Sequence, residues 1–248
     1  MKISIIYFSP TGNTKKTLMA MAHAAGDNIE EIDLTAAKEF DGIHFGSDDA
    51  VILGAPVYSG RIPIIARERF EKITGSGTPC LAVVTYGNRD YDDALLELSD
   101  MAQAQGFKVK GAAAVVGRHT YGEIQTNRPD AADLERDGEF AREAFAKNEA
   151  CPDLILPGNK PYRDGGYGGK FRPLTSSACV KCGLCVRQCP VHAIGDDCIT
   201  IGDECISCFR CIRNCPVKAK NMDTEAYNSF AAMFSEKLKD RKENQYFV

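Results

Sequence analysis

Eight of the chain's eleven cysteines lie between residues 179 and 215, in two copies of one spacing pattern. In each copy the last cysteine precedes a proline: Cys179, Cys182, Cys185 and Cys189-Pro190, then Cys205, Cys208, Cys211 and Cys215-Pro216. Every position recurs 26 residues later, so the stretch is an internal duplication. Three thiolates at this interval can hold three corners of a cubane iron–sulfur cluster, while the fourth points elsewhere. Each copy therefore needs the other.

Two other kinds of site use several cysteines. Structural zinc sites favour two separated Cys-x-x-Cys pairs, and disulfide frameworks are typical of short secreted chains. Neither explains a third cysteine at the same interval or the proline after the fourth. Both stay open as less favoured alternatives to a pair of clusters.

Residues 179–216 resemble the two-cluster bacterial ferredoxins over their whole length, with all eight ligand positions matched. The resemblance implies two [4Fe-4S] clusters and an exchange of the last ligand between the copies. The first cluster would be held by Cys179, Cys182, Cys185 and Cys215. The second would be held by Cys205, Cys208, Cys211 and Cys189. Cys80, Cys151 and Cys198 fall outside the pattern, and we interpret them as structural.

Length and charge limit the function. A chain of 248 residues fits one large or two modest domains, and its formal net charge of −4 gives no support to nucleic-acid binding. The segment 170–220 contains eight basic residues and only four acidic ones. This excess of positive charge either offsets the negative charge of the clusters or keeps a small surface soluble. The sequence shows no cleavage-type leader and no apolar run of membrane-spanning length. We expect a soluble cytoplasmic protein, in which thiols stay reduced.

The N-terminal segment has the pattern of a phosphate-binding turn. An apolar, β-branched run over residues 2–8 is followed by the turn 9–14 and then by apolar residues at helical spacing. Backbone N–H groups at a helix start attract phosphate, the hydroxyls of Ser9, Thr11 and Thr14 add donors, and Gly12 permits close approach of the backbone. A capped turn that binds no ligand is the alternative.

Two more loops follow apolar strands, residues 56–63 after the strand 50–55 and residues 86–92 after the strand 79–85. Ligands of open α/β sheets bind at the carboxyl ends of such strands. The turn 9–14 resembles the phosphate loop of flavodoxins, which bind FMN, although Ser9 stands where many flavodoxins have threonine. The resemblance gives the candidate FMN residues: Ser9, Thr11, Gly12, Asn13, Thr14, Pro56, Val57, Tyr58, Ser59, Gly60, Tyr86, Gly87, Asn88 and Tyr91.

The same resemblance suggests individual roles. Tyr58 is the candidate for stacking on the flavin ring, and the Gly60 carbonyl is the candidate acceptor for flavin N5. Tyr86 and Asn88 are the expected side-chain contacts of the third loop. Two residues stay open: Arg61 either faces the ring or is a solvent-facing charge, and Tyr91 either contacts the flavin or caps the next helix. The segment 118–128 either borders the cofactor or crosses the surface.

Strands predicted at 2–8, 28–34, 50–55, 79–85 and 107–117 alternate with helical patterns, which predicts an α/β fold with a doubly wound parallel sheet. The flavodoxin resemblance supplies the strand order 2-1-3-4-5. We expect a flavodoxin-like FMN domain over 1–150, a Pro/Gly-rich linker over 151–169, a small α+β bacterial ferredoxin-like domain over 170–222, and a C-terminal helix and tail over 223–248. Asp130 and Thr224 are expected helix N-caps.

The C-terminal helix has a large aromatic face, which must be covered either by packing across both domains or by a homodimer contact. Its charged continuation, residues 237–243, is expected to be frayed or solvated.

The order of the parts resembles the flavodoxin–ferredoxin fusion family. The resemblance implies an electron-transfer protein that passes single electrons between two [4Fe-4S] clusters and FMN, to or from a redox partner protein or small-molecule acceptor. An FMN-dependent reductase of a small organic substrate is the first alternative. An iron–sulfur sensor or scaffold with an empty flavodoxin domain is the second. The spacing identifies no catalytic acid, so whether the chain is an enzyme stays open.

Overall fold

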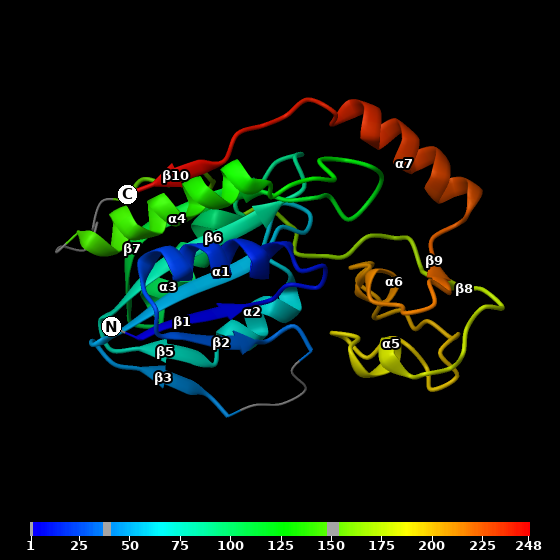
Figure 1. The fold of residues 1–248 in the computed structure, drawn as a ribbon, viewed down its shortest axis with the longest axis horizontal. Helices are drawn as coiled ribbons and strands as arrows, with labels where there is room; N and C mark the ends of the chain where they lie inside the picture. The colour runs from blue at the N-terminus through cyan, green and yellow to red at the C-terminus, as the bar shows by residue number, and fades with distance from the viewer. Residues whose placement is uncertain (1, 37–40, 148–153) are drawn as a thin grey trace.

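The computed structural model describes residues 2–36, 41–147 and 154–248 (Figure 1). It shows a layered α/β part and a smaller part that carries the cysteine pattern. The smaller part lies beyond the carboxyl ends of the strands. The expected domain boundary at residue 150 and Cys151 lie outside the described residues.

The large part is built on a six-stranded sheet with the order β10-β7-β6-β4-β1-β2. Five strands run parallel: β1 (Lys2–Tyr7), β2 (Ile29–Asp33), β4 (Asp49–Pro56), β6 (Thr78–Tyr86) and β7 (Phe107–Val116). Counted along the chain, these five have the order 2-1-3-4-5, so the predicted doubly wound sheet is confirmed. A short parallel pair, β3 (Ile43–Phe45) and β5 (Ile73–Gly75), forms a separate sheet that the sequence did not suggest.

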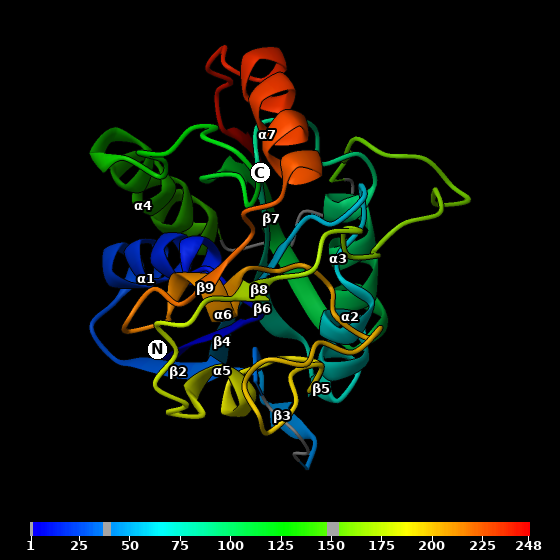
Figure 2. The same cartoon turned by 90° about the vertical axis from the view of Figure 1, so that its right-hand side faces the viewer.

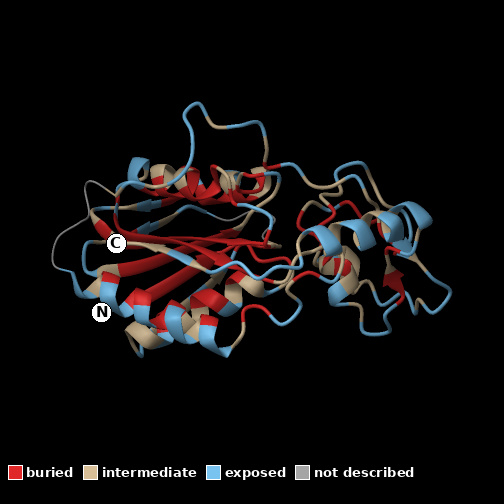
Figure 3. Ribbon diagram, turned by 90° about the horizontal axis from the view of Figure 1, so that it is seen from above, coloured by how far each residue is buried: buried red, intermediate tan, exposed pale blue. Residues whose placement is uncertain are grey.

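The central strands are buried on both faces because helices cover each side (Figures 2 and 3). Helices α1 (Asn13–Ala25) and α4 (Ala131–Ala146) pack on one face, where Ile5, Leu18 and Phe140 share a core. Helices α2 (Ile64–Phe70) and α3 (Ala94–Ala104) pack on the other, where Leu53, Phe70 and Leu95 share the second core. Residues buried on both sides explain why these strands read as continuous apolar runs rather than alternating ones.

The cysteine-bearing part keeps the sequence duplication in its structure. Its short helices α5 (Leu184–Arg187) and α6 (Arg210–Arg213) are 26 residues apart, as are the left-handed residues before them, Gly183 and Phe209. A two-stranded antiparallel sheet of β8 (Leu174–Thr175) and β9 (Lys220–Asn221) closes this part.

Both predicted helix caps are present. The Asp130 side chain accepts a hydrogen bond from the Asp133 N–H at the start of α4, and Thr224 Oγ1 accepts one from Tyr227 N–H at the start of α7 (Glu225–Lys237). Both oxygens therefore satisfy an N–H that would lack a partner within its helix. Among the described residues, no helix is both long and apolar enough to cross a lipid bilayer.

The aromatic face of α7 is covered within the chain. Its Tyr227 and Phe230 rings lie 5.2 and 5.3 Å from that of Phe171, and Phe234 lies 5.1 Å from the His119 ring. Packing across both parts of the chain, one of the two alternatives raised by the sequence, therefore covers this face in part, and its aromatic side chains stay partly exposed.

The charged segment 237–243 is largely solvent-exposed, as one of the two alternatives predicted, but it is not frayed, because its backbone is hydrogen-bonded to the body of the protein. After α7 the chain returns to the sheet and forms β10 (Gln245–Phe247), which pairs antiparallel with β7. The Asn88 side chain donates to the carbonyls of Leu238 and Asp240 and accepts from Lys242 N–H. Charged residues mark this segment, but the polar groups that bind it come from distant loops, and sequence spacing gives no signal for them.

Candidate functional site

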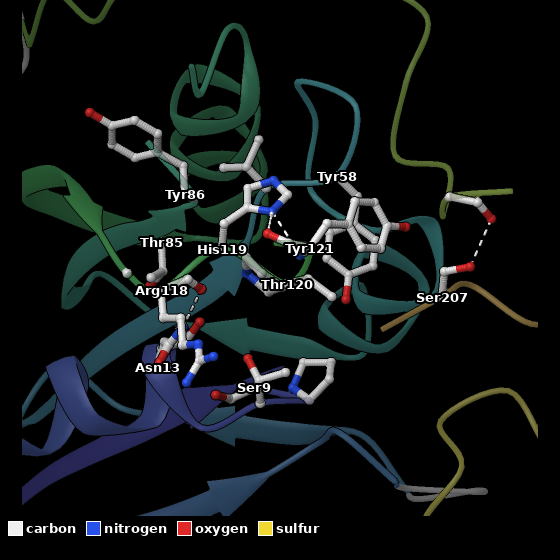
Figure 4. A pocket seen from close by; sticks show the side chains of 18 of the residues that line it. Ser9, Asn13, Tyr58, Thr85, Tyr86, Arg118, His119, Thr120, Tyr121 and Ser207 are labelled. Atoms are coloured by element: carbon white, nitrogen blue, oxygen red, sulfur yellow. Dashed lines mark hydrogen bonds between the residues drawn. The ribbon is translucent and has the colours of Figure 1, made fainter. Parts of the chain in front are cut away.

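A pocket of about 770 Å³, open mouth included, lies at the carboxyl ends of β1, β4, β6 and β7 (Figure 4). We call it the carboxyl-end pocket. The following residues line it: Ser9, Pro10, Thr11, Asn13, Thr14, Pro56, Val57, Tyr58, Ser59, Thr85, Tyr86, Gly87, Gly117, Arg118, His119, Thr120, Tyr121, Tyr167, Gly169, Ile206 and Ser207. Its size is in the range of small-molecule and cofactor sites.

The turn between β1 and α1 forms one wall of this pocket. Gly12 has φ 89°, a left-handed conformation that lets the chain turn sharply into the helix. Ser9 Oγ accepts a hydrogen bond from Lys15 N–H, and Asn13 Nδ2 donates to the Arg118 carbonyl, which ties the turn to the loop after β7. The first turn of α1 has no acidic residue, so the positive end of its dipole is available to an anion.

Two buried polar atoms in the pocket wall have no hydrogen-bond partner among the described residues. They are Thr85 Oγ1 and Arg118 Nε. Buried polar groups are nearly always paired in folded proteins, and an unpaired one lowers stability. Two of them beside a helix N-terminus therefore fit a bound molecule that carries both an anionic group and hydrogen-bonding atoms.

Ten of the fourteen candidate FMN residues line the pocket: Ser9, Thr11, Asn13, Thr14, Pro56, Val57, Tyr58, Ser59, Tyr86 and Gly87. Gly12, Gly60, Asn88 and Tyr91 are not in its lining. Asn88 binds the tail, and the Tyr91 hydroxyl donates to Gln245 Oε1 at 2.6 Å. The structure thus places these two side chains against the C-terminal segment rather than in the pocket.

Gly60 and Arg61 also have partners elsewhere. The Gly60 carbonyl accepts a hydrogen bond from Asp93 N–H at 3.1 Å, so a bond to a flavin would require that peptide to rotate. Arg61 makes two hydrogen bonds to Glu97, at 2.6 and 2.7 Å, and its guanidinium lies 4.5 Å from the Tyr162 ring. Arg61 was predicted either to face the flavin ring or to be a solvent-facing charge. Both predictions were wrong, because Arg61 is half-buried in an ion pair with Glu97.

Other pocket residues were missed or left open. Gly117, Arg118 and Thr120 line the pocket and directly follow β7, the fifth parallel strand. Because ligands bind at the carboxyl ends of parallel strands, the position of these residues after a predicted strand could have identified them. His119 and Tyr121 had been left undecided, and the structure places both in the pocket wall. Ile206 and Ser207 lie within the second cysteine copy and also line the pocket. No local sequence pattern predicts this position for them.

The aromatic and imidazole groups of the pocket are uncharged at neutral pH. Burial lowers the pKa of His119 to about 4, and burial raises the pKa of Tyr121 to about 12. Burial, followed by the nearby Cys208, raises the pKa of Tyr58 well above its usual value. The pocket therefore offers neutral rings to a bound molecule, with Arg118 as the charged side chain in its lining.

The eight cysteines gather around two cavities. The second cysteine cavity is lined by Cys189, Cys205, Cys208 and Cys211. The first cysteine cavity is lined by Cys179, Cys182, Cys185 and Cys215, with Cys198 as a fifth. The structure therefore brings the predicted ligands together in two sets of four, each with its last member from the other copy.

Backbone N–H groups point at several of these sulfurs. Cys189 Sγ accepts from Ala193 N–H at 3.3 Å, and the duplicated Cys215 Sγ accepts from Ala219 N–H at 3.2 Å. Such donors stabilise a thiolate. No three cysteine, histidine, aspartate or glutamate side chains of the described chain converge tightly enough to hold a single metal ion. The donor set, four thiols spread around each cavity, fits a cluster with one iron per thiolate.

Two family models match the chain. A flavodoxin domain model matches residues 4–75, and a 4Fe-4S binding domain model matches residues 174–195. The two matches give this chain the domain order of a flavodoxin–ferredoxin fusion. The chain combines a flavodoxin domain with a 4Fe-4S binding domain, which is the organisation of an iron–sulfur flavoprotein.

Solved structures resemble the flavodoxin domain. A flavodoxin from the domain Archaea is 16% identical, with 59% of this chain and 97% of that one covered and a TM-score of 0.43. Oxidised flavodoxin 1 from Bacillus cereus is 20% identical, with 60% and 100% covered and a TM-score of 0.43. General stress protein 14 from Treponema denticola, in complex with FMN, is 15% identical, with 59% and 97% covered and a TM-score of 0.34. Among curated proteins none matches the fusion.

The two domains of the fusion share a wall. Ile206 and Ser207 stand between Cys205 and Cys208, and they line both the carboxyl-end pocket and the second cysteine cavity. Arg210 Nη1 reaches the Ser9 carbonyl at 3.3 Å, and Arg69 Nη2 donates to the Pro190 carbonyl at 2.7 Å. The second cysteine cavity is thus fixed against the pocket by contacts on two sides.

The linker of the fusion also packs into this wall. A Cβ atom on Gly168 would lie 2.2 Å from the Ile206 carbonyl oxygen, and one on Gly169 would lie 1.8 Å from the Tyr121 hydroxyl. A side chain at Gly168 would therefore clash with the Ile206 backbone, and one at Gly169 would require the Tyr121 ring to move. The glycines, which in the sequence indicated only a connector, permit this close approach.

Proposed function

We propose that this fusion transfers electrons between FMN in the carboxyl-end pocket and two [4Fe-4S] clusters in the cysteine cavities. The observation that carries the proposal is the shared wall: Ile206 and Ser207 border both the pocket and the second cysteine cavity. A cofactor in the pocket would then lie one layer of residues from the second cluster. We infer the order FMN, second cluster, first cluster.

The pocket residues support FMN. The turn 9–14 and the N-terminus of α1 would hold the phosphate, while Thr85 Oγ1 and Arg118 Nε would gain the partners that they lack among the described residues. Tyr58 supplies aromatic surface for the ring. A bound flavin accepts one or two electrons, whereas each cluster passes one at a time, which is the chemical reason for joining them.

A redox partner would meet the chain at the first cysteine cavity. Cys182 is exposed there, and Val180 and Val217 beside it are 63% and 40% exposed. The second cavity is less accessible, with Cys189, Cys208 and Cys211 all buried. We therefore propose that electrons enter or leave through the first cluster, to or from a partner protein or a small-molecule acceptor.

Quantitation of iron, sulfide and flavin in anaerobically purified protein is the first test. We expect about eight irons, about eight sulfides and about one FMN per chain. Zinc in place of iron, or about four irons, would contradict the two-cluster proposal. Protein without flavin would favour the sensor alternative, and turnover of a small organic acceptor without any partner protein would favour the reductase.

The order of the centres is tested with two variants at duplicated positions. Cys189→Ala removes a ligand of the second cluster, and Cys215→Ala removes the equivalent ligand of the first. After flash photoreduction with single electrons, cluster-to-flavin transfer followed by visible absorbance should persist in Cys215→Ala. In Cys189→Ala it should slow at least about tenfold, because the cluster next to the pocket is gone. Equal rates in the two variants would contradict the proposed order.

A further inference from the structure

The wall of the first cysteine cavity contains a lysine that is almost fully buried. Lys220, the first residue of β9, lines this cavity together with the four predicted ligands of the first cluster. Only 3% of it is exposed. Burying a charged amine lowers stability unless an opposite charge lies near it. A lysine at this place therefore indicates an anionic partner.

Among the described residues no carboxylate pairs with this lysine. Lys220 Nζ donates a hydrogen bond to the neutral Thr175 Oγ1 at 2.6 Å, and no acidic side chain of the described chain forms a salt bridge with it. Asp197, on the hairpin that carries Cys198, is exposed and accepts hydrogen bonds from Thr200 Oγ1 and Thr200 N–H. The positive charge is thus left for a group that enters the cavity.

Thr175 holds the ammonium group at the cavity. Thr175 and Lys220 are paired across β8 and β9, so their side chains start from adjacent backbone positions. The Thr175 hydroxyl accepts from Lys220 and donates to the carbonyl of Cys198 at 3.1 Å, and Cys198 is itself part of the cavity lining. An ammonium has three N–H donors, and Thr175 takes one of them. The described residues therefore leave donors for a bound anionic group.

The duplicated position in the first copy is apolar. Ile194 stands 26 residues before Lys220, is 6% exposed and lines the second cysteine cavity. That cavity takes its charged lining residue from another position, Arg210, whose Nη1 reaches the Ser9 carbonyl. Because isoleucine fills the equivalent buried position in one copy, packing alone does not require a lysine in the other.

We propose that the Lys220 ammonium is the counter-charge of the first cluster and raises its reduction potential. The inference rests on the proposed function, because it requires a cluster among the four cysteines of this cavity. Reduction adds one electron, supplied by a redox partner or by dithionite, and one negative charge, while the proton stays on Lys220. A buried positive charge stabilises the more negative state, and net charge is among the factors that set cluster potentials.

The test is a redox titration monitored by EPR on the wild-type chain, Lys220→Met and Lys220→Arg. Methionine keeps an unbranched side chain without the charge, and arginine keeps the charge. At an effective dielectric constant of about 20, one nearby charge changes a one-electron equilibrium constant about tenfold. Tenfold corresponds to about 59 mV, so Lys220→Met should lower the midpoint potential of the first cluster by about 60 mV. Lys220→Arg should stay near the wild type, and an unchanged midpoint in Lys220→Met would overturn the proposal.

Lys218→Met is the matched control, because it makes the same substitution two residues earlier at an exposed lysine. Salt screens exposed charges far more than buried ones. Any shift in Lys218→Met should therefore shrink in about 1 M salt, whereas the shift in Lys220→Met should persist. Equal shifts that both disappear in salt would contradict a buried counter-charge.

Two cysteine variants assign the shift to a cluster. In the Cys189→Ala background, which is expected to keep the first cluster alone, Lys220→Met should lower the midpoint as it does in the full protein. In the Cys215→Ala background, which is expected to keep the second cluster alone, the shift should be less than half as large. A larger shift in the second background would mean that Lys220 acts on the wrong cluster.

Iron content separates failure of this inference from failure of the proposed function. Wild-type protein with far fewer than about eight irons defeats the proposed function itself. Loss of about four irons in Lys220→Met but not in Lys220→Arg supports the counter-charge, because only the charged variant then binds the first cluster. Loss in both variants refutes it, because the position would then require the shape of lysine rather than its charge.

Discussion

Residues in one loop can look equivalent in sequence and serve different purposes. Tyr86 and Asn88 are two positions apart and were both expected to contact the flavin. Tyr86 lines the pocket, whereas the Asn88 amide is 1% exposed and bonded to Leu238, Asp240 and Lys242. Thr85 shows the reverse case: no motif marked this strand threonine, yet its buried hydroxyl has no hydrogen-bond partner in the part of the chain that the structure describes.

Replacing Thr85 with valine keeps the shape of the side chain and removes the hydroxyl. We expect the dissociation constant of FMN to rise about three- to tenfold, because one hydrogen bond contributes a net binding free energy of about that size. The free energy of unfolding without FMN should stay the same or increase, because an unpaired buried hydroxyl is removed. Fluorescence titration with FMN and urea unfolding measure the two effects.

Thr78→Val on the same strand is the matched control. Thr78 Oγ1 donates toward the Phe45 and Gly46 carbonyls, far from the pocket. This variant should lose about 1–2 kcal/mol of stability and bind FMN as the wild type does. An unchanged FMN affinity in Thr85→Val would show that the hydroxyl does not contact the cofactor.

At the scale of elements, the C-terminal strand β10 joins the two domains by a route that bypasses the linker. Its Tyr246 hydroxyl donates to Asp137 Oδ1 on α4 at 2.7 Å, and Asn244 Nδ2 donates to the same oxygen at 3.3 Å. Burial raises the pKa of Asp137 to about 7, and the Tyr246 hydrogen bond opposes this only in part. The docking site of the tail therefore contains a carboxyl group that ionises near neutral pH.

Asp137 should make the protein less stable as the pH rises. Its native pKa lies above its unfolded value of about 3.9, so the native state binds more protons than the unfolded state between about pH 4 and pH 7. Stability is lost over this interval, and the loss is complete above it. In Asp137→Asn, which cannot ionise, the gain over wild type in free energy of unfolding should be about 2–3 kcal/mol larger at pH 8 than at pH 5.

Urea unfolding at the two pH values measures this difference. His119, with its pKa lowered to about 4, acts in the opposite direction because its unfolded form binds protons first as the pH falls. It is common to both proteins and cancels in the comparison. A gain that did not depend on pH would mean that Asp137 is already ionised, or never ionises, over this range.

At the scale of the whole molecule, the three cavities form a series from the sheet to the surface. The carboxyl-end pocket adjoins the second cysteine cavity, Cys185 and Cys211 share a small core between the two cysteine cavities, and the first cavity reaches solvent at Cys182. Exposed Lys181, Arg187 and Lys218 surround this outer end. Its positive charge would favour the approach of anionic or acidic redox partners.

Lys218→Glu should slow cluster reduction by the anionic reductant dithionite about two- to fivefold at low ionic strength. The difference from wild type should shrink in high salt, because exposed charges are then screened. Stopped-flow absorbance at two salt concentrations measures it. Lys108→Glu makes the same charge change on exposed Lys108 near the amino end of β7, away from the cysteine part, and should have little effect. Equal slowing by both variants would rule out entry at the first cavity.

The sequence by itself determined what depends on local spacing. Apolar runs and turns gave the parallel strands, helical periodicity and polar caps gave the helices, and the duplicated cysteine pattern gave two sets of four thiols. Only the tertiary structure decided which distant groups meet: Ile206 and Ser207 with the flavodoxin loops, Asn88 with the tail, and Cys198 with the first cysteine cavity. These contacts depend on how whole elements pack, and packing joins residues whose separation along the chain follows no period.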